Sequence, residues 1–149
     1  MATKWLTPTE MAAWRSFIDT TGDLMRAIEK DLEPFGLDRG DYQLLAMLSE
    51  APEQELRMCD LADSLRLTRS GLTRRMEGVL KKKLVTRVQS VEDGRVAYAK
   101  ITPKGMELLK EAAPEHLESV RRLMIDLLSP SEIKAIATAF SKIANNLNA

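Results

Sequence analysis

Hydrophobic residues recur every three or four positions over much of this chain, which is the spacing of one face of an α-helix. The first such stretch spans residues 9–32 and stops before Pro34. A second stretch starts at Asp38 or Asp41, either of which can cap a helix, and it reaches Leu48. The first third of the sequence therefore predicts two helices.

The next stretch predicts two further helices that are separated by a turn. Residues 56–57 are long enough only for a stub of strand, and residues 58–65 carry a short helical pattern. Thr68 lies in the turn that follows and can cap a helix over residues 69–83.

After these helices the pattern becomes that of strands. Residues 84–89 and residues 96–101 are strand-like, and the loop between them contains Asp93-Gly94. An Asp-Gly pair between two such segments is a strong hairpin signal. This part of the chain therefore predicts a β-hairpin.

The remainder of the chain predicts two helices. The first covers residues 103–128, with Thr102 as its cap and a proline at its first position. Pro114 is expected to kink or break it, because proline lacks the N–H that an interior helical residue donates. The second helix begins at Ser129-Pro130.

This order of elements is that of a winged helix-turn-helix domain, in which the helix after the turn enters the major groove of DNA and the hairpin forms a wing. The sequence thus predicts a mainly α fold with a small β-hairpin wing, in the α+β class. The winged domain is assigned to residues 37–101, with helical segments at 5–33 and 102–148 on either side.

The helix that begins at Arg69 has two distinct faces when residues are placed at about 100° intervals. Its apolar residues fall on one face: Leu72, Met76, Val79 and Leu80. The opposite face is polar, with Arg69 at its edge: Ser70, Thr73, Arg74, Glu77 and Lys81. Arginine can read guanine through two hydrogen bonds, and hydroxyl groups can bond bases or phosphates. We therefore expect DNA recognition by four residues: Arg69, Ser70, Thr73 and Arg74. Thr68 and Lys81 are expected to contact the DNA backbone.

The predicted wing carries Arg87 on its first strand and Arg95 just after its turn. An arginine at a wing tip can enter a narrow minor groove, where the potential is most negative. Arg95 can instead form a surface pair with Asp93 or Glu92, and a pair with Asp93 can also hold the arginine in position. We expect Arg87, Asp93 and Arg95 to form the wing part of the site.

Charge is distributed unevenly along a chain whose net charge is 0. Residues 1–65 hold 6 Lys and Arg against 13 Asp and Glu, a net charge of −7. Residues 66–100 hold 10 against 3, a net charge of +7, and the rest of the chain holds 6 of each. A solvated charged face is one interpretation of the basic stretch. Because this stretch coincides with the predicted reading helix and wing, a phosphate-bearing partner is the other.

Composition narrows the class of protein. A chain of 149 residues with 44% hydrophobic and 30% charged residues is typical of a soluble globular domain. No apolar run approaches the roughly 20 residues of a membrane span, and no signal-peptide core is present, so we expect a cytoplasmic protein without membrane contact. The lone Cys59 is expected to be buried and inert. No Gly-rich phosphate loop or cluster of His and Cys occurs, so no enzyme, metal site or cofactor is expected.

Several segments carry a resemblance to a known family. They are Leu56-Arg-Met-Cys-Asp-Leu-Ala-Asp-Ser-Leu, Leu67-Thr-Arg-Ser-Gly-Leu-Thr-Arg, Leu84-Val-Thr-Arg, Glu92-Asp-Gly-Arg and Ile101-Thr-Pro-Lys-Gly. In these segments the sequence resembles the MarR family of bacterial transcription regulators. The order of the helices before and after also fits, so the resemblance covers nearly the whole chain.

The resemblance implies a homodimer on double-stranded DNA, with the segments 5–33 and 102–148 intertwined as dimerisation helices. The two winged domains then read the halves of a pseudo-palindromic operator, and the Asp-x-Arg motif of the wing maps to Asp93 and Arg95. Members of the family mostly repress, and many release DNA on binding a small, often aromatic or anionic effector.

Large apolar groups in the terminal segments agree with a dimer, because water is an unfavourable place for so many of them. They are Trp5, Trp14, Phe17 and Phe140. Packing within one chain is the alternative. Trp14, Tyr42 and Met47 were considered as an effector pocket, but such residues at helical spacing are usually core, so the ligand-binding residues stay unknown.

Three glycines qualify the expected DNA contacts. Gly71 costs about 1 kcal/mol relative to Ala inside a helix and indicates a close approach to the preceding helix or to DNA. Gly78 stands where the family has a larger, often basic residue, and Gly94 replaces a second wing arginine. The alternative function is a winged-helix module that binds protein without specific DNA binding, against which the arginines at 69, 74 and 95 argue.

Overall fold

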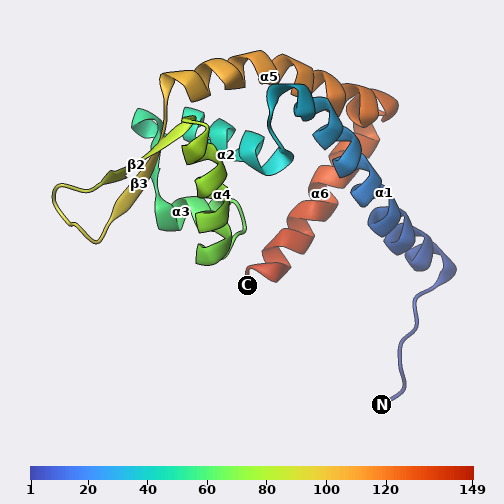
Figure 1. Cartoon of the computed structure of the whole chain (residues 1–149). Coiled ribbons are helices and arrows are strands. Elements are labelled where there is room, and N and C mark those ends of the chain that lie inside the picture. The colour runs from blue at the N-terminus through green and yellow to red at the C-terminus, as the bar shows by residue number, and fades with distance from the viewer.

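The computed structural model describes residues 1–149, which form six α-helices, three short 3-10 helices and one antiparallel sheet (Figure 1). The α-helices are α1 (Pro8–Leu32), α2 (Arg39–Glu50), α3 (Met58–Ser64), α4 (Arg69–Lys81), α5 (Pro103–Leu123) and α6 (Pro130–Leu147). The strands are β1 (Glu55–Arg57), β2 (Val85–Gln89) and β3 (Ala97–Ile101). The 3-10 helices are η1 (Glu33–Phe35), η2 (Pro52–Gln54) and η3 (Ile125–Leu127). The sheet, α3 and α4 lie at one end of the molecule, α1 and α6 lie at the other, and α5 connects the two ends (Figure 1).

Side-chain caps set the beginnings of five of the six α-helices. Each cap accepts a hydrogen bond from a backbone N–H three residues later: Thr7, Asp38, Thr68, Thr102 and Ser129. Of the two caps expected for α2, Asp38 is the one observed. Asp41 in turn accepts a hydrogen bond from the Asp38 N–H, which completes a capping box. The predicted bounds of α1 to α4 are thereby confirmed to within one or two residues.

α5 departs from the prediction. We expected a helix as far as Leu128 with a kink or break at Pro114. The helix does not break at Pro114, but it ends earlier than expected, at Leu123. Met124, with φ −139° and ψ −66°, breaks the helix. Buried residues on both sides of the proline, Ala112 and Ser119, hold the helix against its neighbours. This packing offsets the one backbone hydrogen bond that the proline removes.

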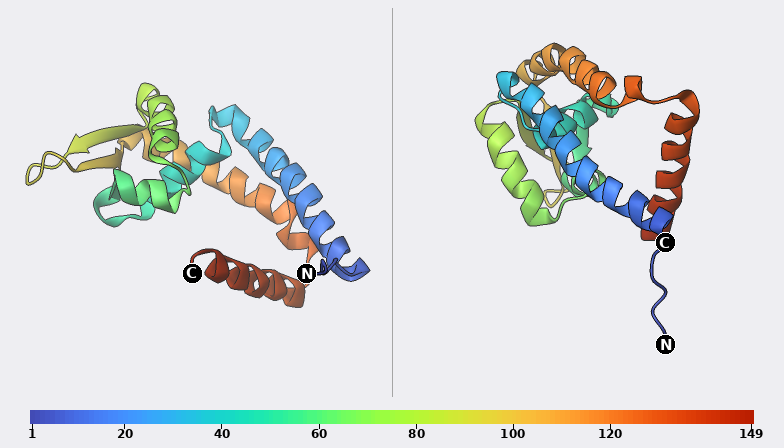
Figure 2. Two further views of the ribbon diagram at one scale, coloured as in Figure 1. Left: turned by 90° about the horizontal axis from the view of Figure 1, so that it is seen from below. Right: turned by 90° about the vertical axis from the view of Figure 1, so that its right-hand side faces the viewer.

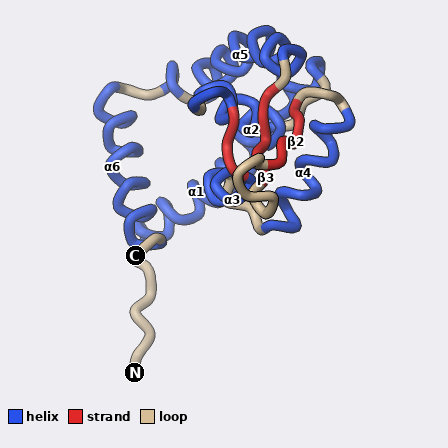
Figure 3. Tube along the Cα trace, turned by 90° about the vertical axis from the view of Figure 1, so that its left-hand side faces the viewer, coloured by secondary structure: helices blue, strands red, loops and turns tan.

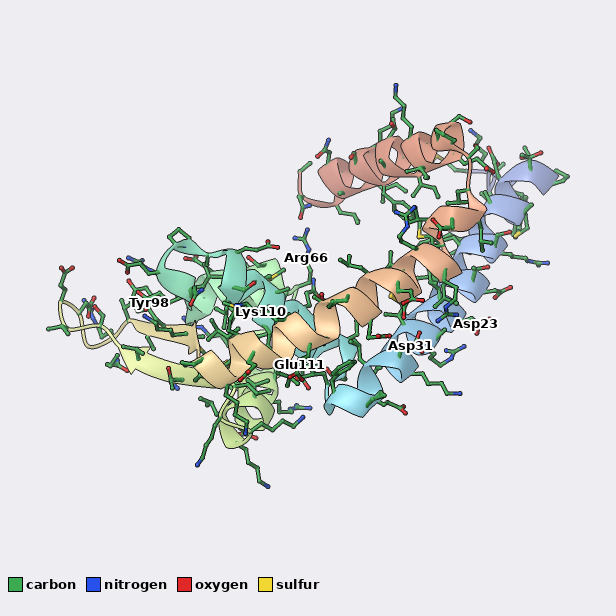
Figure 4. The ribbon with its side chains drawn as sticks, turned by 90° about the horizontal axis from the view of Figure 1, so that it is seen from above. Asp23, Asp31, Arg66, Tyr98, Lys110 and Glu111 are labelled. Atoms are coloured by element: carbon green, nitrogen blue, oxygen red, sulfur yellow. The ribbon has the colours of Figure 1, made fainter.

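A polar link joins α5 to the end of α1. Ser119 of α5 is buried, and its hydroxyl donates to Asp31 Oδ2 of α1 at 2.6 Å. Arg122 Nη2 donates to the same carboxylate oxygen at 2.8 Å. Asp31 lies against α5 at this point (Figure 4). The two helices are therefore fixed to each other by charge as well as by packing.

The sheet has the order β1-β3-β2, and the predicted hairpin and strand stub are confirmed. Ala97, Ala99 and Ile101 of β3 are buried and face the core. The hairpin loop is longer than a two-residue Asp-Gly turn, because the last bond that spans it joins the Ser90 N–H to the Val96 carbonyl oxygen at 2.8 Å. Gly94 has no positive φ, so the mirror-image turn that favours glycine is absent there.

The hydrophobic core lies under the winged end of the molecule. One cluster of 16 buried residues joins α2, α3, α4, the sheet, α5 and the end of α1. The largest of its fully buried side chains are Leu32, Leu44, Leu45, Leu48, Leu61, Val79, Leu84 and Val85. α6 contributes no buried residue.

α6 and the N-terminal part of α1 lie apart from this core and meet each other (Figure 2). The rings of Phe17 and Phe140 have centroids 5.5 Å apart, and those of Trp14 and Phe17 are 6.2 Å apart. These rings nevertheless remain largely in solvent, with 55% of Trp14 and 43% of Phe140 exposed. Contact within one chain therefore covers only part of this apolar surface. α6 stands on the side of the molecule away from the sheet (Figure 3). None of the helices has both the length and the apolar character that crossing a membrane requires.

The close packing of α5 on the sheet gives a stability prediction. A methyl group on Gly105 would collide with the carbonyl oxygen of Leu84 and come within 2.9 Å of Ile101 Cγ1. Gly105→Ala should therefore lower the free energy of unfolding by about 1–3 kcal/mol. Gly78→Ala is the matched control, because nothing lies within 4 Å of a methyl group there. It should raise stability by about 1 kcal/mol.

Urea denaturation at one fixed protein concentration measures both variants. A Gly105→Ala protein as stable as the wild type would contradict the close contact.

Candidate nucleic-acid interface

α4 turns its apolar residues into the core and its polar residues outward. Leu72, Met76 and Val79 are buried. The residues expected on the reading face are all exposed: Arg69, Ser70, Thr73, Arg74, Glu77 and Lys81. The two faces assigned from the sequence are confirmed in this respect, and the charged side of the helix is available to a partner.

The first turn of α4 is held by hydroxyl groups. Thr68 Oγ1 accepts from the Gly71 N–H at 3.0 Å and lies 3.2 Å from Ser70 Oγ. Thr73 Oγ1 donates to the Arg69 carbonyl oxygen at 3.0 Å, so this hydroxyl group keeps its acceptor capacity for a partner. A methyl group on Gly71 would lie 3.1 Å from Thr68 Oγ1. Within the chain, the close approach at Gly71 is thus to its own capping residue and not to the preceding helix, while the alternative of a close approach to DNA stays a prediction.

An ion-pair cluster, which the sequence analysis missed, joins α4 to the start of α2. Arg75 Nη1 donates to Asp38 Oδ1 and Oδ2 at 2.5 and 2.6 Å and to Asp41 Oδ1 at 3.0 Å. The side chains of Asp41 and Arg75 are only 11% and 29% exposed. A side chain on Gly40 would occupy the place of the guanidinium group. The signal in the sequence was an arginine beside the buried face of α4, where a charge needs a partner.

The cluster determines the protonation of its members. Burial alone would raise the pKa of Asp38, but hydrogen bonds from Arg75 and from the Asp41 N–H outweigh it and hold the pKa below the usual 3.8. The hydrogen bond to Asp38 also raises the pKa of Arg75. The pair is therefore charged at neutral pH, and it fixes the rotation of α4 on α2.

In the wing, Asp93 holds the backbone and the side chain of Arg95. Asp93 Oδ1 accepts from the Arg95 N–H at 3.0 Å and from Arg95 Nε at 3.2 Å. The backbone hydrogen bond is the main reason that the pKa of Asp93 is lowered. The Arg95 side chain is 92% exposed. The surface pair considered from the sequence is therefore present, and it leaves the guanidinium group accessible.

A hollow of about 380 Å³ lies between α3, α4 and the part of the wing next to its loop, and we call it the arginine hollow. Four of the expected site residues line it: Arg69, Thr73, Arg87 and Arg95. The others, at positions 68, 70, 74, 81 and 93, do not. Arg57 and Cys59 also line it, and neither was expected there.

Cys59 is exposed, so the expectation of a buried thiol is wrong. It lies on the outer side of α3, whose core-facing residues are Leu61 and Ala62. In a helix this short, two inward positions are enough to anchor it.

The residues considered for an effector pocket have separate surroundings. Tyr42 of α2 stacks on His116 of α5 with ring centroids 4.2 Å apart, and Trp14 packs on Phe17. Burial raises the pKa of Tyr42 and lowers that of His116. The structure contains no group of three or more His, Cys, Asp or Glu side chains that could hold a metal ion.

The elements and their order define a winged helix-turn-helix protein, and comparison with known proteins identifies its family. Residues 35–96 match the sequence profile of the MarR family. The chain is similar to the crystal structure of AbsC, a MarR family transcriptional regulator from Streptomyces coelicolor, with 38% identity and a TM-score of 0.95 over 98% of this chain and 99% of AbsC. The chain belongs to the MarR family of transcriptional regulators, which are not enzymes.

Two further relatives agree. Sco3205, a MarR family regulator from Streptomyces coelicolor whose crystal structure is in complex with DNA, is 32% identical, with a TM-score of 0.95 over 99% of this chain and 93% of Sco3205. The HTH-type transcriptional regulator MhqR of Bacillus subtilis (strain 168) is 27% identical over 119 residues, which is 80% of each chain. The fold and family expected from the sequence are therefore confirmed.

The Arg75 cluster predicts a stability that depends on pH. Asp38→Asn keeps a good helix cap but removes the charge that faces Arg75, so we expect a loss of about 1–2 kcal/mol at pH 7. The folded pKa of Asp38 lies below its unfolded value, so its stabilising charge is fully present above that value and is lost as the pH falls. The variant and the wild type should therefore converge between about pH 5 and pH 2.

Urea unfolding of both proteins across this range measures the difference. A gap that is as wide in acid as at pH 7 would show that the charge of Asp38 does not cause it.

Proposed function

We propose that this protein is a sequence-specific regulator that binds double-stranded DNA as a homodimer and represses transcription from a pseudo-palindromic operator. One observation carries the proposal. The segment of net charge +7 folds so that its apolar residues enter the core while four of its arginines lie exposed on the outside of α4 and the wing, namely Arg69, Arg74, Arg87 and Arg95. The relative Sco3205, solved in complex with DNA, supports it.

The reading elements then have separate tasks. α4 enters the major groove, where Ser70, Thr73 and Arg74 are exposed along its outer side. Thr68, Arg69 and Lys81 lie at the ends of this surface and contact the backbone or flanking bases. The wing, with Arg87 on β2 and Arg95 positioned by Asp93, approaches the minor groove.

The ends of the chain form the dimer in this proposal, with residues 5–33 and 102–148 as the dimerisation segments and residues 37–101 as the DNA-binding region. α6 has no buried residue although its sequence is amphipathic. Exposed apolar groups remain on both terminal segments, including Trp5 at 81% and Leu147 at 76%. A second copy of the chain is the partner that would cover both surfaces at once.

An effector completes the proposal. Family membership supports release of the DNA by a small aromatic or anionic molecule, and a protein of this function works in the cytoplasm, beside the chromosome. A thermal-shift screen of aromatic acids tests this part, because a ligand of the native state raises the melting temperature.

DNA binding is tested by footprinting and gel shift on the region upstream of the protein's own gene. Arg74→Ala should weaken operator binding by about 1–3 kcal/mol and relax the base preference, since an arginine fork to guanine is lost. Arg95→Ala should weaken binding with less effect on sequence choice. Failure to bind any duplex at low salt would refute the regulator and would favour a protein-binding module.

The dimer has its own measurement. Light scattering at micromolar concentration should give a mass of about twice the 16.7 kDa of one chain. Phe140→Asp should lower that mass by placing a charge in the apolar surface, whereas Lys134→Ala on the same helix should leave it unchanged. A monomeric wild type would refute the dimer.

A further inference from the structure

The arginine hollow differs from an ordinary surface depression in its charge. Four arginines line it, namely Arg57, Arg69, Arg87 and Arg95, and no acidic side chain does. The other large hollow, of about 680 Å³ between α1 and α5, is lined by four acidic residues and two basic ones. Only Arg95 among the four has a salt-bridge partner, Asp93, so most of the positive charge of the arginine hollow is not balanced.

The arginines come from four separate parts of the fold. Arg57 ends β1, Arg69 begins α4, Arg87 lies in β2, and Arg95 lies in the wing loop. Because Arg87 is paired with Ala99 of β3, it shares the face of the sheet that turns toward α4. The fold thus brings together, around one depression, cations that are up to 38 residues apart in the sequence.

Arg57, Arg69 and Arg87 form no salt bridge within the chain. Arg57 instead interacts with the side chain of Tyr98, and this interaction raises the pKa of Arg57. Tyr98 lies in β3 near the end that leads into the wing loop (Figure 4). Unpaired like charges around one depression repel each other, and an anion that enters it removes this cost. Guanidinium groups suit phosphate oxygens because they can donate two parallel hydrogen bonds.

We propose that the arginine hollow holds backbone phosphates of bound DNA, and that Arg57 is a further DNA-binding residue. This inference rests on the proposed function. It separates the residues of the interface into two groups. Arg69 and Arg87 contact the DNA backbone, whereas Ser70 and Arg74 lie outside the hollow and read the bases. Arg57 would contribute affinity without sequence preference.

Salt dependence tests the role of Arg57. Fluorescence anisotropy with the footprinted operator and with an unrelated duplex of equal length gives the affinity over a range of salt concentrations. Arg57→Ala should bind both duplexes about tenfold more weakly, and the slope of log affinity against log salt should fall by about 1. Arg57→Lys should keep most of the slope, because it keeps the charge.

Arg26→Ala is the matched control. It removes the same charge from α1, where Arg26 pairs with Asp23 and both side chains are 74% exposed, so the fold should not depend on it. The slope for this variant should equal that of the wild type.

The single cysteine gives an independent readout. Cys59 is exposed and lines the hollow, so a maleimide dye should label it in the free protein. As duplex is added, the labelling rate should fall in proportion to the fraction of protein that is bound, and it should be slowest at saturating duplex. In a Cys59→Ser protein that carries Ser131→Cys at the start of α6, labelling should be the same with and without DNA.

The outcomes separate the inference from the proposed function. A wild type that binds no duplex overturns the proposed function. A wild type that binds DNA while Arg57→Ala matches Arg26→Ala, or while Cys59 labels at the same rate in the complex, overturns the phosphate assignment and leaves the regulator intact.

Discussion

α4 must bury one side and expose the other, and the rest of the structure depends on this constraint. Leu72, Met76 and Val79 enter the core, and burying side chains of this size stabilises a fold by roughly 1.5–3 kcal/mol each. The same insertion forces the polar side of the helix into solvent. A display of cations on a short helix is therefore stable only because the apolar residues behind it pack so completely.

Arg75 stands on the boundary between these two sides. Its charge cannot enter the core unpaired and does not belong to the outer surface. Asp38 and Asp41, at the start of α2, accept hydrogen bonds from Arg75 and neutralise its charge. The start of α2 therefore fixes the rotation of α4. These two acidic residues are thus used to orient α4.

Most of the fold could be predicted from local signals in the sequence. Thr68 capped α4 as expected, because a cap depends only on residues a few positions away. The end of α5 could not be read in this way, since the helix stops before Met124, where no proline or glycine marks a break. Likewise, hydrogen bonds made by Ser90 and Asp93 shape the wing loop more than the Asp-Gly pair does.

In the candidate site, too, local features could be predicted from the sequence, whereas features that depend on tertiary packing could not. The outer face of α4 followed from periodicity alone. The partners of Arg75 and the exposure of Cys59 did not, because both depend on which elements meet in space. The gathering of arginines around the hollow likewise required the hairpin to be placed against α4, and no spacing along the chain encodes that.

Gly78 has a consequence of another kind. It lies on the exposed side of α4, away from the buried face, and nothing fills the space around it. A side chain that begins there with free space around its Cβ can extend into solvent without disturbing the core. A duplicated or redesigned copy of the gene can therefore vary the outer surface of α4 through a single codon while keeping the packing behind it.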